Sequence, residues 1–297
     1  MWYYFNKVDI KIDLKGNGHM IKKKLTAQKL FMENQSLFKC PICNEMMLIK
    51  DFTLCCYHNH SFDISKKGYL NLLTANNVSI YPKALFLSRK RICKLGLYNP
   101  LINEIINIIC KSNPVYILDA GCGEGSHLVN LYNKCGLRNK YIGIDISKES
   151  IKIATNNLEN IMWCVADTSR LPFQSSSFDL ILNILAPANY SEFLRVLKND
   201  GMIIKVIPGK LYLQELRAVI YQNEKLKYSN YEVKSLFYQE LAVVESICVK
   251  YQFTVKEELV HDLVTMTPLS FGKIDLNIFK GDFVVTVDLE ILLGKKK

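Results

Sequence analysis

The sequence predicts an α/β fold in which a doubly wound parallel sheet, with helices on both faces, follows a small N-terminal metal-binding module. Two observations lead to this fold class. From about residue 113 onward, apolar strand-like runs alternate with helical patterns, which is the arrangement of consecutive βαβ units. Ahead of that region, four cysteines and two histidines fall between positions 40 and 60. A segment this short needs a metal to supply the stability that its core cannot.

Length, composition and charge limit the class of protein. With 297 residues, 49% of them hydrophobic, the chain can bury one large core and carry a small appendage. The net charge of +10 favours a polyanionic partner such as nucleic acid, although a general bias toward Lys, Asn and Ile would give the same surplus. No apolar run approaches the roughly 18–20 residues that span a bilayer, and residues 1–5 lack the basic start of a signal peptide. We therefore expect a cytoplasmic chain with no membrane partner.

Four segments follow one another along the chain. Residues 1–35 are polar and basic without a clear apolar period, which predicts a disordered extension. Residues 36–74 hold the cysteine cluster and form the expected zinc-binding module. Residues 75–112 are expected to form a linker followed by a helix, and residues 113–297 are expected to form the α/β domain.

Six runs of strand composition lie in the last segment. The first five are separated by ~10–20 residues, the length of a parallel βαβ crossover. The sixth is expected to complete the sheet as an antiparallel hairpin strand. The runs are residues 115–120, 141–145, 161–165, 178–183, 202–207 and 283–292.

A glycine-rich turn follows the first of these strands. Residues 119–125 read D-A-G-C-G-E-G, with Asp119 ahead of Gly121, Gly123 and Gly125. Glycines at these positions open backbone angles that are closed to other residues and let the main chain approach a ligand. Such a pattern is weak evidence by itself, because dinucleotide-binding domains use similar turns.

Two acidic residues at strand ends sharpen this interpretation. Asp145 ends the second strand, 20 residues after Gly125, where a carboxylate can accept both hydroxyls of a ribose. Asp167 follows the third strand, just ahead of the L-P-F sequence at 171–173, where it can accept the amino group of an adenine. With the glycine turn, these residues resemble the pattern of class I methyltransferases, which implies S-adenosylmethionine as the cofactor. The alternative is that both acids only cap helices.

The cysteine cluster has the spacing of a structural zinc site. Cys40 and Cys43 form a C-x2-C knuckle, and the spacing C-x2-C-x12-C-x3-H then reaches Cys56 and His60, a Cys3His ligand set. A further cysteine at position 55 and a histidine at position 58 leave the last two ligands open on spacing alone. A zinc bound by four protein side chains has no open position for catalysis, which favours a structural and substrate-binding role.

The segment after the cluster makes the chain recognisable. Residues 60–73 read H-S-F-D-I-S-K-K-G-Y-L-N-L-L. Together with the C-P-I-C knuckle and the glycine turn, this segment strongly resembles the bacterial 23S rRNA (guanine-N1)-methyltransferase family, whose members modify a guanine in the hairpin 35 region. The resemblance runs from about residue 38 to the C-terminus. It implies methylation of guanine N1 in 23S rRNA, one structural zinc and a homodimer.

The resemblance also implies particular site residues. The zinc ligands become Cys40, Cys43, Cys56 and His60. The cofactor contacts become Tyr98, Gly123, Glu124 and Tyr212. The best-known branch of the family has a histidine where this chain has Tyr212. Residues 1–31 have no counterpart in the family, which suggests that translation starts near Met32.

Two further segments are candidates for contact with RNA. The Arg-Lys-Arg run at residues 89–91, with Lys94, is expected to meet phosphates, unless it is an ordinary solvated helix face. The loop after the fourth strand should face the acceptor base, and its substrate-positioning candidates are Asn183, Ala186 and Pro187. No general base is identifiable.

The resulting expectation is an S-adenosylmethionine-dependent methyltransferase that acts on guanine N1 of 23S rRNA. Two alternatives stay open on the residues alone. One is a small-molecule methyltransferase with a structural zinc knob, and the other is a non-catalytic zinc protein that binds RNA.

Overall fold

A computed structural model describes residues 17–74, 81–136, 138–156, 160–221, 229–267 and 278–297. Three expectations fall partly outside these residues: the N-terminal extension at residues 1–16, the linker at residues 75–80, and the α/β domain at residues 137, 157–159, 222–228 and 268–277.

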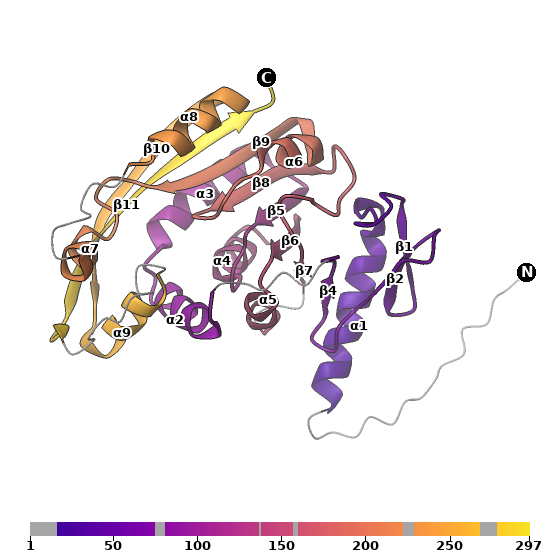
Figure 1. Ribbon diagram of the computed structural model, residues 1–297, viewed down its shortest axis with the longest axis horizontal. Helices are drawn as coiled ribbons and strands as arrows, with labels where there is room; N and C mark the ends of the chain where they lie inside the picture. The colour runs from indigo at the N-terminus through magenta and orange to yellow at the C-terminus, as the bar shows by residue number, and fades with distance from the viewer. Residues whose placement is uncertain (1–16, 75–80, 137, 157–159, 222–228, 268–277) are drawn as a thin grey trace, which may run out of the picture.

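An eight-stranded sheet forms the centre of the molecule (Figure 1), in the order β10-β11-β9-β8-β5-β6-β7-β4. Its strands are β4 (Tyr69–Asn71), β5 (Tyr116–Ala120), β6 (Lys140–Asp145), β7 (Met162–Val165), β8 (Phe178–Ile184), β9 (Leu197–Pro208), β10 (Ala242–Val255) and β11 (Phe283–Lys295). The five strands expected between residues 115 and 207 are all present. β10 was not among the expected strands.

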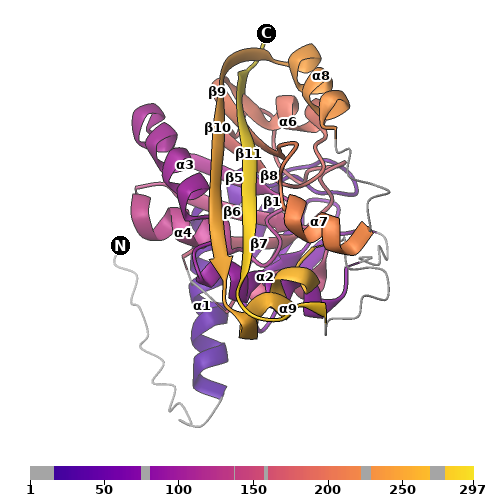
Figure 2. The ribbon, with the colours of Figure 1, turned by 90° about the vertical axis from the view of Figure 1, so that its left-hand side faces the viewer.

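Strand direction fixes where a ligand can bind. The pairs from β4 to β9 are all parallel, whereas β11 runs antiparallel to both β9 and β10. The expected antiparallel terminal strand is therefore confirmed, and Figure 2 shows it beside β10 as a long pair. The chain reverses its winding direction at β5, and such a switch point at the carboxyl ends of the strands is where doubly wound sheets bind ligands.

Helices and a second small sheet cover both faces of this sheet. The helices are α1 (Asn17–Glu33), η1 (Gln35–Leu37), α2 (Lys83–Lys94), α3 (Asn99–Ser112), α4 (Ser126–Cys135), α5 (Lys148–Ala154), α6 (Tyr190–Val196), α7 (Gln214–Tyr221), α8 (Tyr231–Glu240) and α9 (Glu257–Thr265). One apolar core lies between the sheet and α2 to α5, α7 and α9. The other lies beneath α1, α6, α8 and the small sheet. No helix in the described ranges is long and apolar enough to cross a bilayer.

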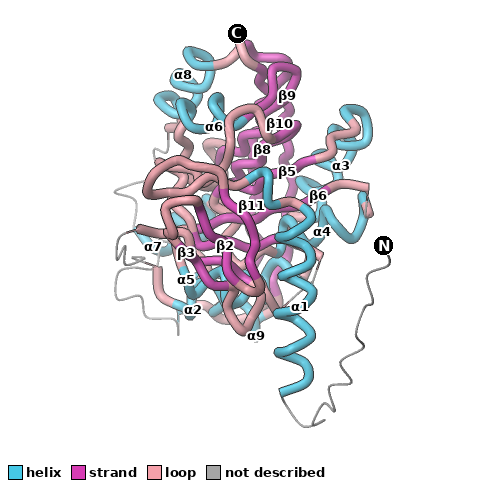
Figure 3. Tube along the Cα trace, turned by 90° about the vertical axis from the view of Figure 1, so that its right-hand side faces the viewer, coloured by secondary structure: helices cyan, strands magenta, loops and turns pink. Residues whose placement is uncertain are grey.

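The cysteine-rich module is built into this fold. Strands β1 (Met47–Lys50), β2 (Thr53–Cys56) and β3 (Ser61–Asp63) form the antiparallel small sheet. β4, the last strand of the expected module, pairs in parallel with β7 at the edge of the large sheet. The segment 36–74 therefore contributes directly to the large sheet, and Figure 3 shows strands β2 and β3 of the small sheet beside α1.

The expectation of a disordered extension over residues 1–35 is wrong for residues 17–33, which form α1. Ala27 and Phe31 are buried at 7% and 0% exposure, and the Phe31 ring lies 5.7 Å from that of Phe38. The Lys23 ammonium donates to the carbonyl of Thr155 at 3.0 Å. The sequence did not reveal this helix because only a narrow apolar stripe is buried.

Candidate functional site

The glycine turn lies at the carboxyl end of β5 and leads into α4. Gly121, Gly123 and Gly125 have φ angles of 86°, 56° and 82°, the left-handed region that glycine adopts readily. A Cβ on Gly121 would lie 2.6 Å from the Cβ of Ala186. A Cβ on Gly125 would lie 2.5 Å from the ring of Trp163. The turn thus needs glycine both for its backbone angles and because neighbouring segments approach it closely.

Asp145 at the end of β6 holds this turn. Its Oδ2 accepts the Gly123 N–H at 2.9 Å, and its Oδ1 accepts the Ser147 N–H at 2.8 Å. Burial raises the pKa of Asp145, although these hydrogen bonds favour the charged form. A carboxylate can accept about four hydrogen bonds, so both oxygens retain capacity for the hydroxyls of a ribose.

Asp119 is a buried acid with one carboxylate oxygen that accepts no hydrogen bond among the described residues. It is 2% exposed, and this oxygen is Oδ2. Burial, together with the nearby Asp145 and Glu124, raises the pKa of Asp119 to about 8. A cluster of buried acids beside a glycine turn fits a cationic ligand with polar groups. S-adenosylmethionine carries a sulfonium and an ammonium group, so these residues suit it.

Two tyrosines from distant parts of the sequence meet beside the turn. The hydroxyl oxygens of Tyr98 and Tyr212 are 2.7 Å apart, and the Tyr98 ring packs edge-on against His127 with centroids 5.0 Å apart. Burial raises the pKa of Tyr212 to about 12, and burial and Arg89 lower that of His127 to about 4. All three groups are therefore neutral at neutral pH. The fold thus brings together two of the four cofactor contacts that the family resemblance implies, Tyr98 and Tyr212.

The segment after Asp167 attaches the cysteine-rich module to the sheet. Asp167 itself is partly exposed and accepts the Ser169 N–H at 2.8 Å. Beyond it, the carbonyl of Pro172 accepts the Lys39 N–H at 3.2 Å, and the rings of Phe38 and Phe173 lie 5.3 Å apart. The L-P-F sequence therefore docks the module next to the expected adenine-binding acid, a role that its sequence did not indicate.

The loop after β8 lies over the glycine turn, through the contact between Ala186 and Gly121. Ala186 is partly exposed and Pro187 is exposed, as a surface facing the acceptor requires. Asn183 needs a correction, because it is fully buried. Its amide donates to the carbonyls of Ala120 and Pro187 and its oxygen accepts from Lys205, so it cannot contact a base directly. Lys205 is a site residue that sequence analysis missed.

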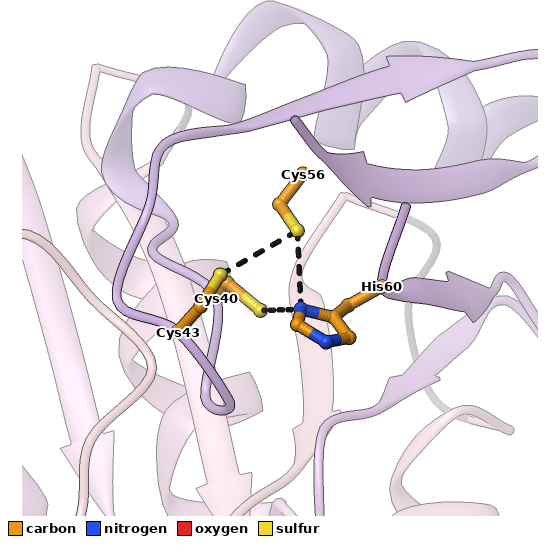
Figure 4. Close-up of side chains that lie close together, drawn as sticks. All are labelled: Cys40, Cys43, Cys56 and His60. Atoms are coloured by element: carbon orange, nitrogen blue, oxygen red, sulfur yellow. Dashed lines mark hydrogen bonds between the residues drawn. The ribbon is translucent and has the colours of Figure 1, made fainter. Parts of the chain in front are cut away.

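Four side chains of the module converge on one point (Figure 4). Their ligand atoms all lie within 4.8 Å of one another, in Cys40, Cys43, Cys56 and His60. The sulfurs of Cys43 and Cys56 are 3.6 Å apart, and the His60 Nδ1 lies 3.5 Å from Cys40 and 3.4 Å from Cys56. Tetrahedral zinc bonds of about 2.0–2.3 Å hold their ligand atoms about 3.5–3.8 Å apart, so the cluster fits this ion.

The neighbouring Cys55 and His58 do not join the cluster. The Cys55 thiol is directed to the carbonyl of Thr53 at 3.9 Å, and the His58 ring centroid lies 6.4 Å from that of His60. Cys55 and Cys56 are successive residues of β2, so their side chains point to opposite faces.

The two arginines of the basic run on α2 bond to α9 and to the residue that follows it, although Arg91 itself stays exposed. Arg91 pairs with Asp262 of α9 through two hydrogen bonds, and Ser88 donates to the same carboxylate at 2.7 Å. Arg89 donates to the carbonyl of Met266 at 3.2 Å. The expectation that this run forms an RNA-binding surface is thus not supported for the two arginines, which join α2 to α9.

Comparison with known proteins agrees with this site. Residues 38–78 match the RlmA N-terminal zinc-ribbon family, and residues 111–261 match a methyltransferase domain family. YxjB of Bacillus subtilis (strain 168), provisionally named a 23S rRNA (guanine-N(1)-)-methyltransferase, is 37% identical over 275 residues, which cover 88% of this chain and 98% of YxjB. The 23S rRNA (guanine(748)-N(1))-methyltransferase of Streptomyces fradiae is 27% identical over 184 residues, or 60% of this chain and 65% of that protein.

Proposed function

The chain belongs to the family of zinc-ribbon 23S rRNA (guanine-N1)-methyltransferases, and from this we propose that it transfers a methyl group from S-adenosylmethionine to N1 of a guanine in 23S rRNA. The family resemblance favours the hairpin 35 region as the location of that guanine. The observation that carries the proposal is the direct contact between the cofactor turn and the acceptor loop, with a Cβ on Gly121 placed 2.6 Å from Ala186.

The bound cofactor supplies a methyl group that its sulfonium has already activated. The protein must hold the acceptor in line with the S–CH3 bond and keep water out, so positioning dominates catalysis. Asp145 is assigned to the ribose hydroxyls and Asp167 to the adenine. The glycine turn would let the main chain approach the cofactor, Asp119 and Glu124 would hold its cationic part, and Tyr98 and Tyr212 would pack beside it.

The acceptor chemistry dictates how the RNA must be presented. N1 lies on the Watson–Crick edge of guanine and carries a proton in the neutral base, so the target must be unpaired or flipped out of its stack. The exposed part of the loop after β8, at Ala186 and Pro187, is where such a base would meet the methyl group. The loop itself, residues 185–189, contains no acid or imidazole, which makes positioning of the base its main task.

One zinc ion, bound by Cys40, Cys43, Cys56 and His60, completes the proposal. A Cys3His site with four protein ligands is structural. Because the L-P-F segment ties the module to the chain after Asp167, this zinc would support both the module's RNA-binding surface and the adenine side of the cofactor pocket.

A methyl-transfer assay with purified protein tests the function and separates the alternatives. With tritium-labelled S-adenosylmethionine and unmodified 23S rRNA, we expect label in the RNA that saturates at one methyl group per molecule. Label that enters only small molecules would indicate a small-molecule methyltransferase. RNA binding without any methyl transfer would indicate a non-catalytic RNA-binding protein.

A further inference from the structure

Lys205 is a buried cation directly behind the acceptor loop. It lies inside β9 at 3% exposure, flanked along the strand by the fully buried Ile204 and Val206. Its Nζ donates to the Asn183 Oδ1 and to the carbonyl of Ala186, both at 2.5 Å. Burying an ammonium group is costly unless hydrogen bonds compensate it, so an apolar residue here would be better for stability alone.

The contacts of Lys205 connect the two halves of the active site. Asn183, which accepts from Lys205, donates in turn to the carbonyl of Ala120 at 2.7 Å and to that of Pro187 at 3.0 Å. Ala120 is the last residue of β5, immediately before the cofactor turn. Hydrogen bonds therefore run without interruption from the acceptor loop, through Lys205 and Asn183, to the edge of the cofactor turn.

The loop that Lys205 holds has an unfavourable backbone. Leu185 has a φ of 52°, a left-handed conformation that costs a residue with a side chain and persists only where its surroundings enforce it. The next residue, Ala186, accepts a hydrogen bond from Lys205 at its carbonyl oxygen, and its Cβ packs directly against Gly121.

We propose that Lys205, acting through Asn183, is a positioning residue for methyl transfer. It fixes the loop at Leu185 and Ala186 at the distance from the cofactor turn that in-line attack requires. This inference rests on the proposed function. Small displacements of reacting groups reduce rates steeply, so the loss of Lys205 should lower kcat more than it weakens binding of either substrate.

Because Lys205 is ionisable, its role as a positioning residue should also make methyl transfer depend on pH. Burial lowers the pKa of Lys205 to about 8. Beside it, β8 places Asn183 and β11 places Leu292, neither of which titrates. The elements packed against β9 carry these ionisable groups: Tyr190 and the pair Glu192–Arg195 on α6, Asp179 of β8 paired with Lys198, Glu290 of β11 paired with Lys234, Asp288 of β11, which accepts the Leu211 N–H, and Lys295 at the end of β11. As the pH rises through about 8, Lys205 loses its charge and its two hydrogen bonds weaken.

Lys205→Met and the control Lys198→Met test the proposal. Lys198 lies on the same strand but pairs with Asp179 at 2.8 Å, outside the active site. On unmodified 23S rRNA we expect Lys205→Met to lower kcat about 10–100-fold, with the KM for S-adenosylmethionine changed less than about threefold. Lys198→Met should match the wild type. An unchanged kcat in Lys205→Met, or a change in KM alone, would overturn the proposal.

The conservative variant Lys205→Arg supplies the pH readout. Arginine stays charged, so the ratio of wild-type to variant kcat should fall as the pH rises from about 7 to about 9. A ratio that is constant with pH contradicts the proposal. This comparison decides the matter if Lys205→Met does not fold.

Hydrogen exchange separates failure of this inference from failure of the proposed function. If the wild type methylates no RNA, the proposed function is wrong, and the exchange of the amides of residues 184–186 alone decides the role of Lys205. Faster exchange there in Lys205→Met than in Lys198→Met supports the hydrogen-bonded connection. Equal exchange in the two variants refutes it.

Discussion

Two adjacent cysteines show how a strand selects ligands at the scale of single residues. Successive side chains of a strand point to opposite faces, so only one of Cys55 and Cys56 can face the cluster. The Cys56 sulfur lies 3.4 Å from the His60 Nδ1, whereas the Cys55 sulfur is directed to the carbonyl of Thr53. The structure thus resolves a choice that spacing alone left open.

Replacement of these cysteines by serine should have opposite results. Cys56→Ser removes one of four converging ligand atoms, so the purified variant should contain little zinc. Cys55→Ser should retain one zinc per chain, because its thiol is 3.9 Å from Thr53 and outside the cluster. Metal analysis of protein prepared without chelator measures both. Full zinc content in Cys56→Ser would mean that another residue completes the site.

Asp145 is the acid on which cofactor binding should depend most. Asp145→Ala removes the expected acceptor for the ribose and also releases the Gly123 N–H that it holds at 2.9 Å. We expect calorimetry to show S-adenosylmethionine affinity weakened by ~1–3 kcal/mol. Unchanged affinity in a folded variant would show that Asp145 only shapes the turn.

At the scale of elements, α1 should stabilise the whole fold rather than form a dispensable extension. Phe31→Ala would remove a ring that is 0% exposed, and such a truncation typically costs about 3–5 kcal/mol. Its neighbour Met32 is 45% exposed, so Met32→Ala should leave the melting temperature nearly unchanged. Equal melting temperatures for the two variants would contradict the packing of α1 and restore the expectation of a disordered extension.

The contact between α2 and α9 should make part of the stability pH-dependent. Burial raises the pKa of Asp262, but hydrogen bonds from Arg91 and Ser88 outweigh it and leave the pKa below its usual 3.8. A lowered folded-state pKa stabilises the protein above the unfolded-state value, and this contribution is lost as the pH falls through the folded-state value.

Asp262→Asn tests this contact. It should lower stability at pH 7 by ~1–2 kcal/mol, and the difference from the wild type should shrink below about pH 4. Asp282→Asn, which breaks an exposed pair with Lys256, should have no measurable effect. An Asp262→Asn effect that is the same at low and neutral pH would rule out the charge as its cause.

At the scale of the whole molecule, much of the architecture and the site is predictable from local patterns. The glycine turn, its strand-end acids and the cysteine spacing are short-range signals, and each lies where the sequence placed it. The contacts missed are long-range. Arg91 meets Asp262 across 171 positions, and Lys205 looks like any strand lysine until β8 is placed beside it. A charged residue in a sequence does not reveal whether its partner is solvent or another helix.

Two contacts fix the cysteine-rich module to the large sheet. β4 extends that sheet, and Phe38 packs on Phe173 at 5.3 Å. RNA held by the module would therefore lie at a fixed position relative to the acceptor loop.

Mass spectrometry of 23S rRNA tests most directly whether the protein methylates guanine N1 of this RNA. RNA from cells that lack this gene should be missing one N1-methylguanosine that the parent cells contain, and treatment with purified protein and S-adenosylmethionine should restore it at the same nucleotide. If the RNA of the deletion strain is fully modified, and the purified protein methylates a small molecule but no RNA, the assignment of 23S rRNA as substrate is contradicted.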